Sequence, residues 1–298
     1  MPKKINIIIT FAVMAMLAAL AMVGGWYYGK DIPTDGWVIK DYPDLSGNQG
    51  SFMTMYNQED GTLIVIDSGW KENEPLVRKV IASYGNHVTA WFLTHYHNDH
   101  VDALNEILEN PGDIQIDAIY DSPINYEFYA AVAYEWDCIE SYDKYLALTE
   151  GDERVHHLLK DDELDIDGLH IKVFNSFREE IEPWGDVPNN ASLVFKITGE
   201  EDSILIMGDA YRQPLPDYLI ENYPEEIKSE YVQAAHHGNN SAPGYFYDYV
   251  GAKEVWFEAP KSLMESDEHT AKELKEYLEG NGVVVKSYMT APNIIYFK

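Results

Sequence analysis

Four side chains that can bind a metal ion occur within six residues, in the stretch His95-Tyr96-His97-Asn98-Asp99-His100. Alternate residues of an extended segment point the same way, so His95 and His97 could bind one ion together. The turn that follows would bring Asp99 and His100 to an adjacent position. Zinc prefers imidazole nitrogen and carboxylate oxygen, and a catalytic zinc site leaves one position open for water. The spacing therefore predicts a divalent-metal site that activates a water molecule.

Two later segments offer further ligands. Asp209 follows Gly208 at the end of an apolar run, where its carboxylate could bridge two ions, although an aspartate in such a place often caps a helix. His236-His237-Gly238 also follows an apolar run, and we expect at least one of these two histidines to bind metal. We predict one or two Zn²⁺ ions, with Mn²⁺ as the alternative.

These candidate ligands stand at the ends of predicted strands. Apolar runs and turn residues predict strands and hairpins, whereas apolar residues at a period of three to four predict helices. The predicted strands are residues 51–56, 62–66, 88–93, 114–120, 163–166, 169–175, 193–198, 203–207, 231–234, 255–258, 283–286 and 294–297. The predicted helices are residues 72–84, 102–110, 216–223 and 269–279, with a long helical passage over 123–149.

The passage over 123–149 is rich in aromatic residues. Tyr129, Val132, Trp136 and Ile139 recur at helical spacing, which is typical of an amphipathic helix that buries this stripe in the core. Other tyrosines of the passage fall off the stripe. Part of this segment is therefore also a candidate roof for a pocket.

Residues 1–30 differ from the rest of the chain. Lysines precede an apolar stretch over 5–23, and aromatic residues follow it, a pattern that predicts a membrane-spanning signal anchor with its N-terminus inside. A cleaved signal peptide is the alternative, because small residues such as Ala21 lie near a processing position. We predict a linker over 31–46, a hydrolase domain over 47–298, and a location outside the cytoplasm, at the cell membrane or secreted.

Charge and cysteine content limit the substrates and the metal ligands that the chain can have. The chain has 298 residues, 21 Lys plus Arg against 51 Asp plus Glu, and a formal net charge of −30. Such a chain repels polyanions, so long nucleic acid is disfavoured as a substrate. Cys138 is the only cysteine, which excludes an internal disulfide and a thiolate metal cluster.

The motifs and their order resemble those of the metallo-β-lactamase fold superfamily. Asp67-Ser68-Gly69 resembles the first motif of that family, 95–100 its main metal motif, Asp209 its bridging carboxylate, and His236 or His237 its last histidine ligand. The segments 189–195, 205–209 and 236–238 are more narrowly similar to the hydrolase domain of competence-type DNA-uptake channel proteins and their free-standing relatives. The resemblance implies an α/β fold, a four-layer αββα sandwich, and metal-dependent hydrolysis.

One position departs from the family pattern. Many members carry a histidine four residues before the small polar residue that matches Ser192, and this chain has Pro188 there. We expect the second metal site either to lack a protein ligand or to recruit another. The candidate replacements are Asn189, Asn190, His170, His156 and His157.

The resemblance also suggests roles for individual residues. Asp99 would bind metal and orient the attacking water, and His237 would donate a hydrogen bond to the developing oxyanion. His269 matches a histidine that recurs in the narrower subgroup, where it would bind or protonate substrate; the alternative is a helix N-terminal residue without a role.

The expected substrate is a small-molecule or cell-surface phosphodiester. A choline-bearing headgroup would reconcile phosphodiester cleavage with the acidic chain, since aromatic side chains bind quaternary ammonium groups. The alternatives are a β-lactamase or lactonase, and a non-catalytic surface binding module that retains the fold.

Overall fold

A computed structural model describes residues 36–211, 213–287 and 292–298. The predicted signal anchor or signal peptide over residues 1–30 lies outside this part of the chain. No helix within the described ranges is long and apolar enough to cross a membrane.

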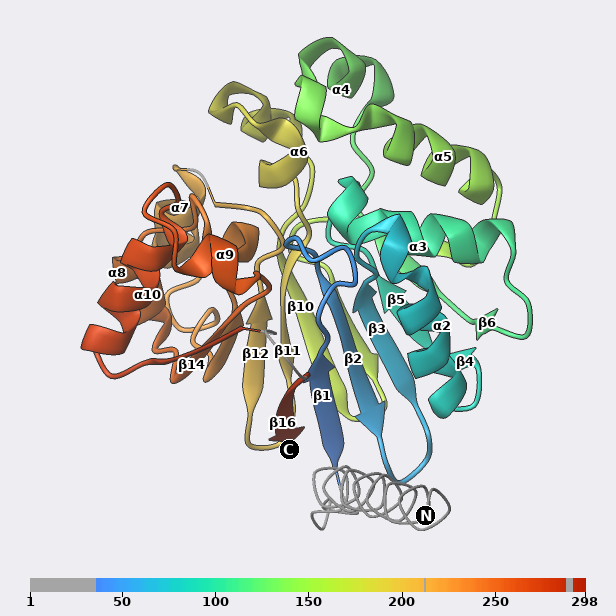
Figure 1. The fold of residues 1–298 in the computed structure, drawn as a ribbon, viewed down its shortest axis with the longest axis horizontal. Helices are drawn as coiled ribbons and strands as arrows, with labels where there is room; N and C mark the ends of the chain where they lie inside the picture. Colours follow the sequence, from blue (N-terminus) through green and yellow to red (C-terminus); the bar gives the residue numbers. More distant parts are fainter. Residues whose placement is uncertain (1–35, 212, 288–291) are drawn as a thin grey trace, which may run out of the picture. The chain divides into compact units, whose positions relative to one another are not determined.

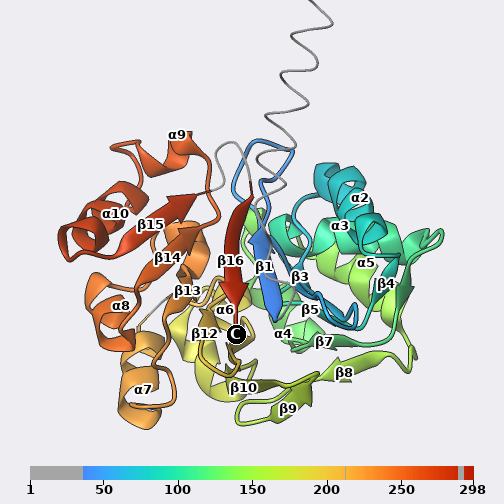
Figure 2. The ribbon, with the colours of Figure 1, turned by 90° about the horizontal axis from the view of Figure 1, so that it is seen from below.

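The strands of the described part form two seven-stranded sheets (Figures 1 and 2). The first sheet has the order β16 (Asn293–Phe297), β1 (Trp37–Asp41), β2 (Phe52–Asn57), β3 (Leu63–Asp67), β5 (Ala90–Phe92), β7 (Ile119–Asp121) and β8 (Val155–His157). The second has the order β15 (Val284–Ser287), β14 (Glu254–Phe257), β13 (Tyr231–Gln233), β12 (Ser203–Ile206), β11 (Val194–Thr198), β10 (Leu169–Asn175) and β9 (Glu163–Ile166). The short strands β4 (His87–Val88) and β6 (Gln115–Ile116) pair separately.

Three apolar clusters hold these sheets in four layers. One cluster lies between the sheets and joins inward residues of both, such as Ile64 and Ile66 with Phe195 and Ile197. A second covers the outer face of the first sheet, and a third covers the outer face of the second (Figure 1). The predicted α/β sandwich with helices on both outer faces is confirmed.

Each outer face is covered by its own helices. The helices on the first sheet are α2 (Glu74–Ser83), α3 (Asn98–Glu109) and α5 (Ile139–Thr149), and the single-turn helix η1 (Lys71–Asn73) precedes them. Those on the second sheet are α7 (Leu215–Asn222), α8 (Gly244–Val250), α9 (Lys261–Met264) and α10 (Ala271–Gly280). The described chain also contains the helices α4 (Tyr126–Val132), η3 (Glu179–Trp184) and α6 (Val187–Asn190).

The predicted hairpins are confirmed, and the domain begins earlier than predicted. β2 pairs antiparallel with β3, β9 with β10, and β11 with β12. However, β1 lies within the predicted linker over 31–46 and pairs with both β2 and β16. This stretch is rich in turn residues, but its run Trp37-Val38-Ile39 is buried and belongs to the first sheet.

Two predicted elements next to the metal motif have different bounds. The predicted strand over 88–93 is divided into β4, which pairs with β6, and β5, which pairs with β3 and β7. The predicted helix over 102–110 begins already at Asn98, so Asp99 and His100 occupy the first turn of α3 rather than a separate turn.

The aromatic passage over 123–149 is not one helix. It divides into α4, the single-turn helix η2 (Glu135–Asp137) and α5, and Cys138 interrupts it with a left-handed backbone at φ 49°. Tyr129 is buried as predicted, but Trp136 is 68% exposed rather than part of the core stripe. The break leaves Tyr134, Glu135 and Trp136 exposed, while Asp137 is buried; residues 134–138 are here called the roof turn.

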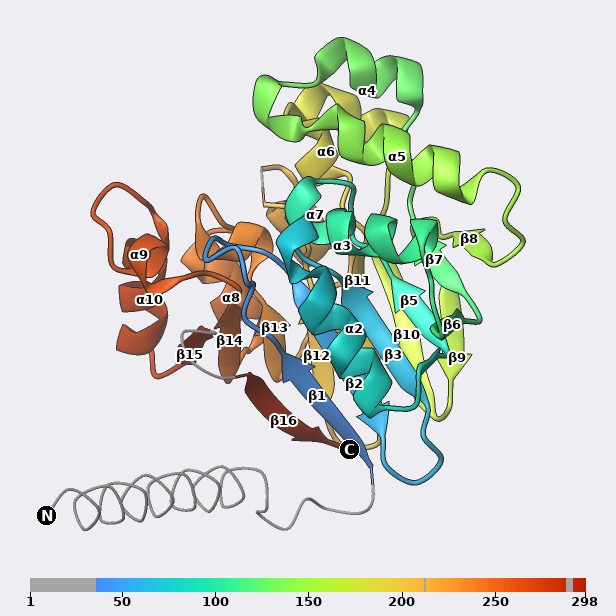
Figure 3. The same cartoon turned by 45° about the vertical axis from the view of Figure 1, so that its right-hand side comes forward.

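The parallel strands bring the motifs to one end of the sandwich. β3 runs parallel to β5, and β12, β13 and β14 are parallel to one another. The metal motif follows β5, Asp209 follows β12, and the two histidines follow β13. Ligand sites in α/β sheets form beyond such carboxyl ends. Figure 3 shows α4, α5 and α6 gathered above one end of the sheets.

The inter-sheet layer carries much of the stability, which can be tested at Phe195. This side chain is fully buried, and its ring centroid lies 5.0 Å from that of Phe92. We expect Phe195→Ala to lower the free energy of unfolding by about 3–5 kcal/mol in chemical denaturation of the metal-free protein. The control Tyr296→Ala removes a side chain that is 44% exposed and should have a much smaller effect. Equal losses in both variants would contradict this view of the core.

Candidate metal centre

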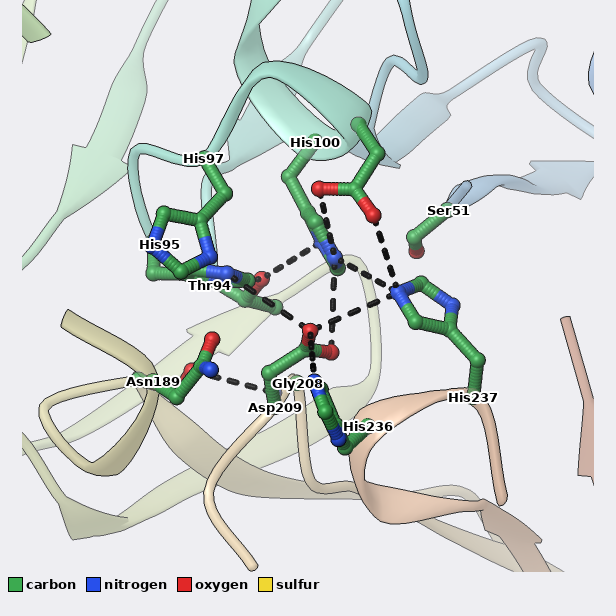
Figure 4. Close-up of polar contacts among 12 residues, drawn as sticks. Ser51, Thr94, His95, His97, His100, Asn189, Gly208, Asp209, His236 and His237 are labelled. Carbon is green, nitrogen blue, oxygen red and sulfur yellow. Dashed lines mark hydrogen bonds and ion pairs between the residues drawn. The ribbon is translucent and has the colours of Figure 1, made fainter. Parts of the chain in front are cut away.

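Five of the seven predicted ligands converge in two overlapping groups within the described chain, whereas His97 and His236 lie outside both groups. His95, His100 and Asp209 form one group, and Asp99, His100 and His237 form the other. The ligand atoms of each group lie within 4.8 Å of one another, and every member is buried. Figure 4 shows the side chains of His95, His100, Asp209 and His237 directed towards a common centre.

Asp209 stands between the two groups. Its Oδ1 lies 3.3 Å from Nε2 of His100, and its Oδ2 lies 3.4 Å from Nε2 of His237 and 3.8 Å from Nε2 of His95. The loop that carries it needs Gly208, whose φ is +51° and whose added Cβ would lie 2.9 Å from the side chains of Ser192 and Thr94. The sheets therefore approach closely enough here for one carboxylate to reach ligands from both.

Asp67 orients His100 from below. Its Oδ2 lies 2.8 Å from Nδ1 of His100, and its two oxygens also accept the amide and the hydroxyl of Thr94. A carboxylate that accepts from one ring nitrogen leaves the other nitrogen free to bind a metal. Nε2 of His100 is the nitrogen that faces the ligand groups.

The two consecutive histidines face different partners. Nε2 of His237 lies 3.3 Å from Oδ2 of Asp99 and 3.2 Å from Nε2 of His100, so His237 belongs with the metal motif. His236 is 24% exposed, its Nδ1 lies 2.6 Å from the carbonyl of Asn239, and its Nε2 lies 4.0 Å from Asp209. His237 is thus placed among the candidate ligands, and His236 lines the cavity.

A left-handed backbone at His236 and His237 directs their side chains to different partners. Both histidines have positive φ, 52° and 54°, within the single-turn helix η4 (Ala235–Gly238). Gly238 continues the left-handed path, and a Cβ at this position would lie 2.3 Å from the ring of Phe257. Such conformations are costly for residues other than glycine and tend to persist at functional sites.

The charges of the site suit a cation. Burial lowers the pKa of His95, and the neighbouring imidazoles lower it further, so its ring is neutral. Burial would raise the pKa of Asp209, but His237, His100 and His95 hold it well below the usual value. In addition, the buried Nε2 of His95 has no hydrogen-bond partner in the described part. A divalent metal would satisfy this orphaned nitrogen, so the residues fit a metal site.

Of the proposed replacements at the Pro188 position, only Asn189 is well placed. Its Nδ2 donates to Asp186, while its Oδ1 is buried without a hydrogen-bond partner, and Figure 4 shows the amide directed towards the cluster. Asn190 instead donates to the backbone carbonyls of 185 and 186.

The three distant histidines are not part of the site. His156 and His157 lie on β8 at the edge of the first sheet, where they contact Tyr120 and Asp121. His170 pairs with Asp165 across the β9–β10 hairpin. Exposed strand positions hold all three away from the ends of the central strands, so these expectations were wrong.

A cavity of about 720 Å³ opens onto the ligands. Its lining residues are Gln49, Trp70, His97, Asn98, Asp99, Tyr134, Trp136, Cys138, Asp186, Asn189, Asp209, Tyr211, His236 and Asn240. None of these described lining residues is lysine or arginine. The rings of Tyr134 and Trp136 stack at 4.7 Å on the roof turn, as do those of Tyr211 and His236 at 4.8 Å. The aromatic passage therefore does roof a pocket in part.

His269 lies beside this cavity and not among the ligands. It is exposed, and it lines a neighbouring hollow of about 330 Å³ together with His236, His237 and Gln49. Thr270, the next residue, bonds to Asn239 and Asn240, which braces this loop against the histidine pair. The placement is compatible with contact to a substrate.

Sequence reasoning missed a buried polar network under the centre. Glu258, at the end of β14, accepts from Ser51 and from Gln233, and Gln233 in turn accepts the amide of Met207 just before the Asp209 loop. Burial raises the pKa of Glu258 to about 7, although His237 and His100 lower it. The only sequence signal was a charged residue that closes the apolar run of β14.

Comparisons with known proteins agree with this geometry. A sequence model of the metallo-beta-lactamase superfamily matches residues 47–234. A comparison with curated proteins gave no match. Among solved structures, the metallo-beta-lactamase fold protein YhfI from Bacillus subtilis is 14% identical with a TM-score of 0.52, over 88% of this chain and 100% of that one.

Two further structures are similar in fold. Igni18, a metallo hydrolase from Ignicoccus hospitalis, is 15% identical with a TM-score of 0.53, over 88% of this chain and 100% of its own. CmlA, a diiron beta-hydroxylase from Streptomyces venezuelae, is 12% identical with a TM-score of 0.58, over 88% of this chain but only 54% of its own. At such identities the likeness concerns the fold alone.

The position of Asp209 between both groups predicts that its loss weakens every bound ion. We expect Asp209→Asn to lower the affinity for Zn²⁺ by at least about tenfold, measured by chelator competition. Asp165→Asn, which changes an exposed carboxylate of the β9–β10 hairpin outside both groups, is the control and should retain the affinity. Unchanged binding in the Asp209 variant would exclude Asp209 as a ligand.

Metal binding should also release protons. Burial lowers the pKa of His237, but Asp209 and Asp99 outweigh it and raise the pKa to about 10; carboxylates likewise raise that of His100. The pair of rings therefore carries at least one extra proton at pH 7 without metal; the two Nε2 atoms lie only 3.2 Å apart, and an ion must displace the protons from them. Calorimetry of Zn²⁺ binding in buffers of different ionisation enthalpy should show about one to two protons released per chain, and weaker binding as the pH falls. Binding without proton release would be inconsistent with these ligands.

Proposed function

Because the chain belongs to the metallo-β-lactamase superfamily, we propose that it is a metal-dependent hydrolase that cleaves a phosphodiester. The observation that carries the proposal is Asp209, buried between two groups of imidazole and carboxylate ligands at the floor of a large cavity. When bound, a divalent cation supplies a water of lowered pKa and a Lewis acid for an oxygen of the scissile bond.

We assign the ligands to two adjacent subsites. The second subsite consists of Asp99, His100 and His237, with Asp209 shared. The first consists of His95 and Asp209, and we add His97 because its ring lies edge-on to that of His95 at 4.7 Å. Asn189 and His236 lie beside it in the cavity: Oδ1 of Asn189 has no hydrogen-bond partner among the described residues, and Nε2 of His236 lies 4.0 Å from Asp209. Zn²⁺ is the proposed metal and Mn²⁺ the alternative.

The protein residues have distinct tasks in the proposed reaction. Asp99 lies 3.3 Å from His237 and also lines the cavity, so it is placed both to bind an ion and to orient the attacking water. His236 and His269 share the neighbouring hollow and are the candidates for contacting the substrate or returning a proton to the leaving group.

Two observations favour a phosphodiester that is neutral or cationic outside its phosphate. The segments around Asn189, Asp209 and His237 are similar to the hydrolase domain of competence-type channel proteins, which favours a phosphodiester. The described cavity lining contains aromatic rings and the carboxylate of Asp186 but no cationic side chain. Stacked rings and a carboxylate suit a quaternary ammonium group such as choline.

The predicted anchor or signal segment lies outside the described residues, and from it we also propose where the protein is located. It would place the site outside the cytoplasm, at the membrane or in secreted form. Choline-bearing headgroups and wall polymers would be accessible there, whereas the net charge of −30 disfavours long nucleic acid.

A substrate panel tests the proposal. The full-length protein, loaded with Zn²⁺ or Mn²⁺, is assayed with bis-nitrophenyl phosphate, nitrophenyl phosphorylcholine, nitrocefin and a homoserine lactone. We expect hydrolysis of the phosphodiesters, fastest for the choline ester, and a loss of at least about 10²-fold in His237→Ala because a ligand is removed. The exposed variant His87→Ala serves as the matched control.

The other outcomes identify the alternatives. Turnover of nitrocefin or the lactone alone would show a β-lactamase or lactonase and overturn the phosphodiester assignment. Metal content below one ion per chain, with no turnover of any substrate, would favour a binding module that retains the fold.

A further inference from the structure

Asp137 is a buried carboxylate that lies against the metal motif. Its side chain is fully buried, and its Oδ1 lies 3.3 Å from Nε2 of His97. Neither of these two buried atoms has a hydrogen-bond partner in the described part of the chain. The contact therefore joins two polar atoms that no other group satisfies. Asp137 comes from η2 in the roof turn, a segment separate in sequence from the metal motif.

Only one oxygen of the Asp137 carboxylate takes part in capping the roof turn. Oδ2 of Asp137 accepts the amide of Tyr134 at 2.6 Å, and its backbone carbonyl accepts the hydroxyl of Tyr129. Oδ1 contributes nothing to the cap. A neutral side chain would cap the turn equally well without the cost of burying a carboxylate, so the charge needs a second explanation.

The position of His97 supplies that explanation. A neutral imidazole carries one N–H, and a metal-bound histidine usually donates it to a carboxylate or carbonyl while the other nitrogen binds the ion. Because Nε2 of His97 faces Asp137, Nδ1 is left for the cavity and the cluster. The ring of His97 lies edge-on to that of His95, with centroids 4.7 Å apart.

The same arrangement already exists at His100 with the nitrogens exchanged. There Asp67 accepts from Nδ1 and leaves Nε2 for the ligand group. The metal motif thus has one buried aspartate behind His100 and another behind His97, each from a different element. Only the first stands in a segment that resembles a family motif.

We propose that Asp137 is a positioning residue that accepts Nε2–H of His97 and so presents Nδ1 to the first metal subsite. This inference rests on the proposed metal binding and deepens it. It explains how that subsite can hold an ion although Pro188 replaces a ligand, because one of its remaining ligands is held in a single tautomer and orientation.

Asp137 links the roof turn to the metal motif, because it belongs to the turn and contacts His97. Tyr134 and Trp136, one on each side of Glu135, line the cavity, and Asp137 follows directly. Nδ2 of Asn98 donates to Sγ of Cys138 at 3.0 Å, which fastens the roof turn to the start of α3. A substrate that contacts the two rings would therefore contact the same turn that orients a metal ligand.

Asp137→Asn in the full-length protein tests the proposal. The amide oxygen can still cap Tyr134, but the amide NH₂ would face Nε2 of His97 and favour the tautomer with its proton on Nδ1, which cannot bind metal. We expect the affinity for the more weakly bound Zn²⁺ to fall about 10- to 100-fold, measured by chelator competition, while the other ion is retained. The Co²⁺-loaded variant should lose the absorption of one of two sites.

Controls separate orientation of a ligand from folding. Glu135→Gln changes an exposed acid of the same turn and should retain both ions; Asp67→Asn should weaken the ion bound by His100 instead. The thermal midpoint of metal-free Asp137→Asn should stay close to that of the unchanged protein. Side-chain ¹⁵N NMR of the Zn²⁺ form reports directly which nitrogen of His97 carries the proton.

Several results would overturn the assignment. These are two ions bound with unchanged affinity in Asp137→Asn, a proton on Nδ1 of His97 in the unchanged protein, or a single ion bound by the unchanged protein. If the unchanged protein binds two ions and the variant loses one, but no substrate of the panel is cleaved, the role of Asp137 stands and the proposed hydrolysis fails.

Discussion

Asp209 is a buried carboxylate held among imidazoles that come from both sheets. His95 and His100 belong to the loop and helix after β5, whereas His237 follows β13. A buried carboxylate is tolerated only where positive charge and hydrogen bonds compensate for lost hydration. Without metal the compensation comes from protons on His100 and His237; a divalent cation can replace them, which makes the site a receptor for metal.

The packing around this centre holds Asp209 close to its imidazole neighbours. The apolar layer between the sheets fixes where β5, β12 and β13 end, and Gly208 allows the strand ends to approach. Glu258 and Gln233 then hold the Asp209 loop from below with buried hydrogen bonds. Each of these contacts is buried, and together they support the loop that carries Asp209.

Much of the fold and of the ligand set could be predicted because the relevant information is local. Short apolar runs separated by turn residues predicted the hairpins. The metal motif and Asp209, each at the end of an apolar run, predicted ligands at the ends of strands. Prediction failed where tertiary contacts override local pattern. Val38 and its neighbours in β1 looked like linker, and Trp136 fitted a helical stripe but lies exposed on the roof turn.

The amino-acid sequence alone determined the types of ligand, their spacing, the acidic charge and the strand ends that carry them, because these properties reside in adjacent residues. Only the tertiary structure decided that His237 rather than His236 joins Asp99, and that Asp137 reaches His97. The physical reason is that the orientation of an imidazole depends on which group lies against each ring nitrogen. That group comes from a distant segment, and packing brings it there.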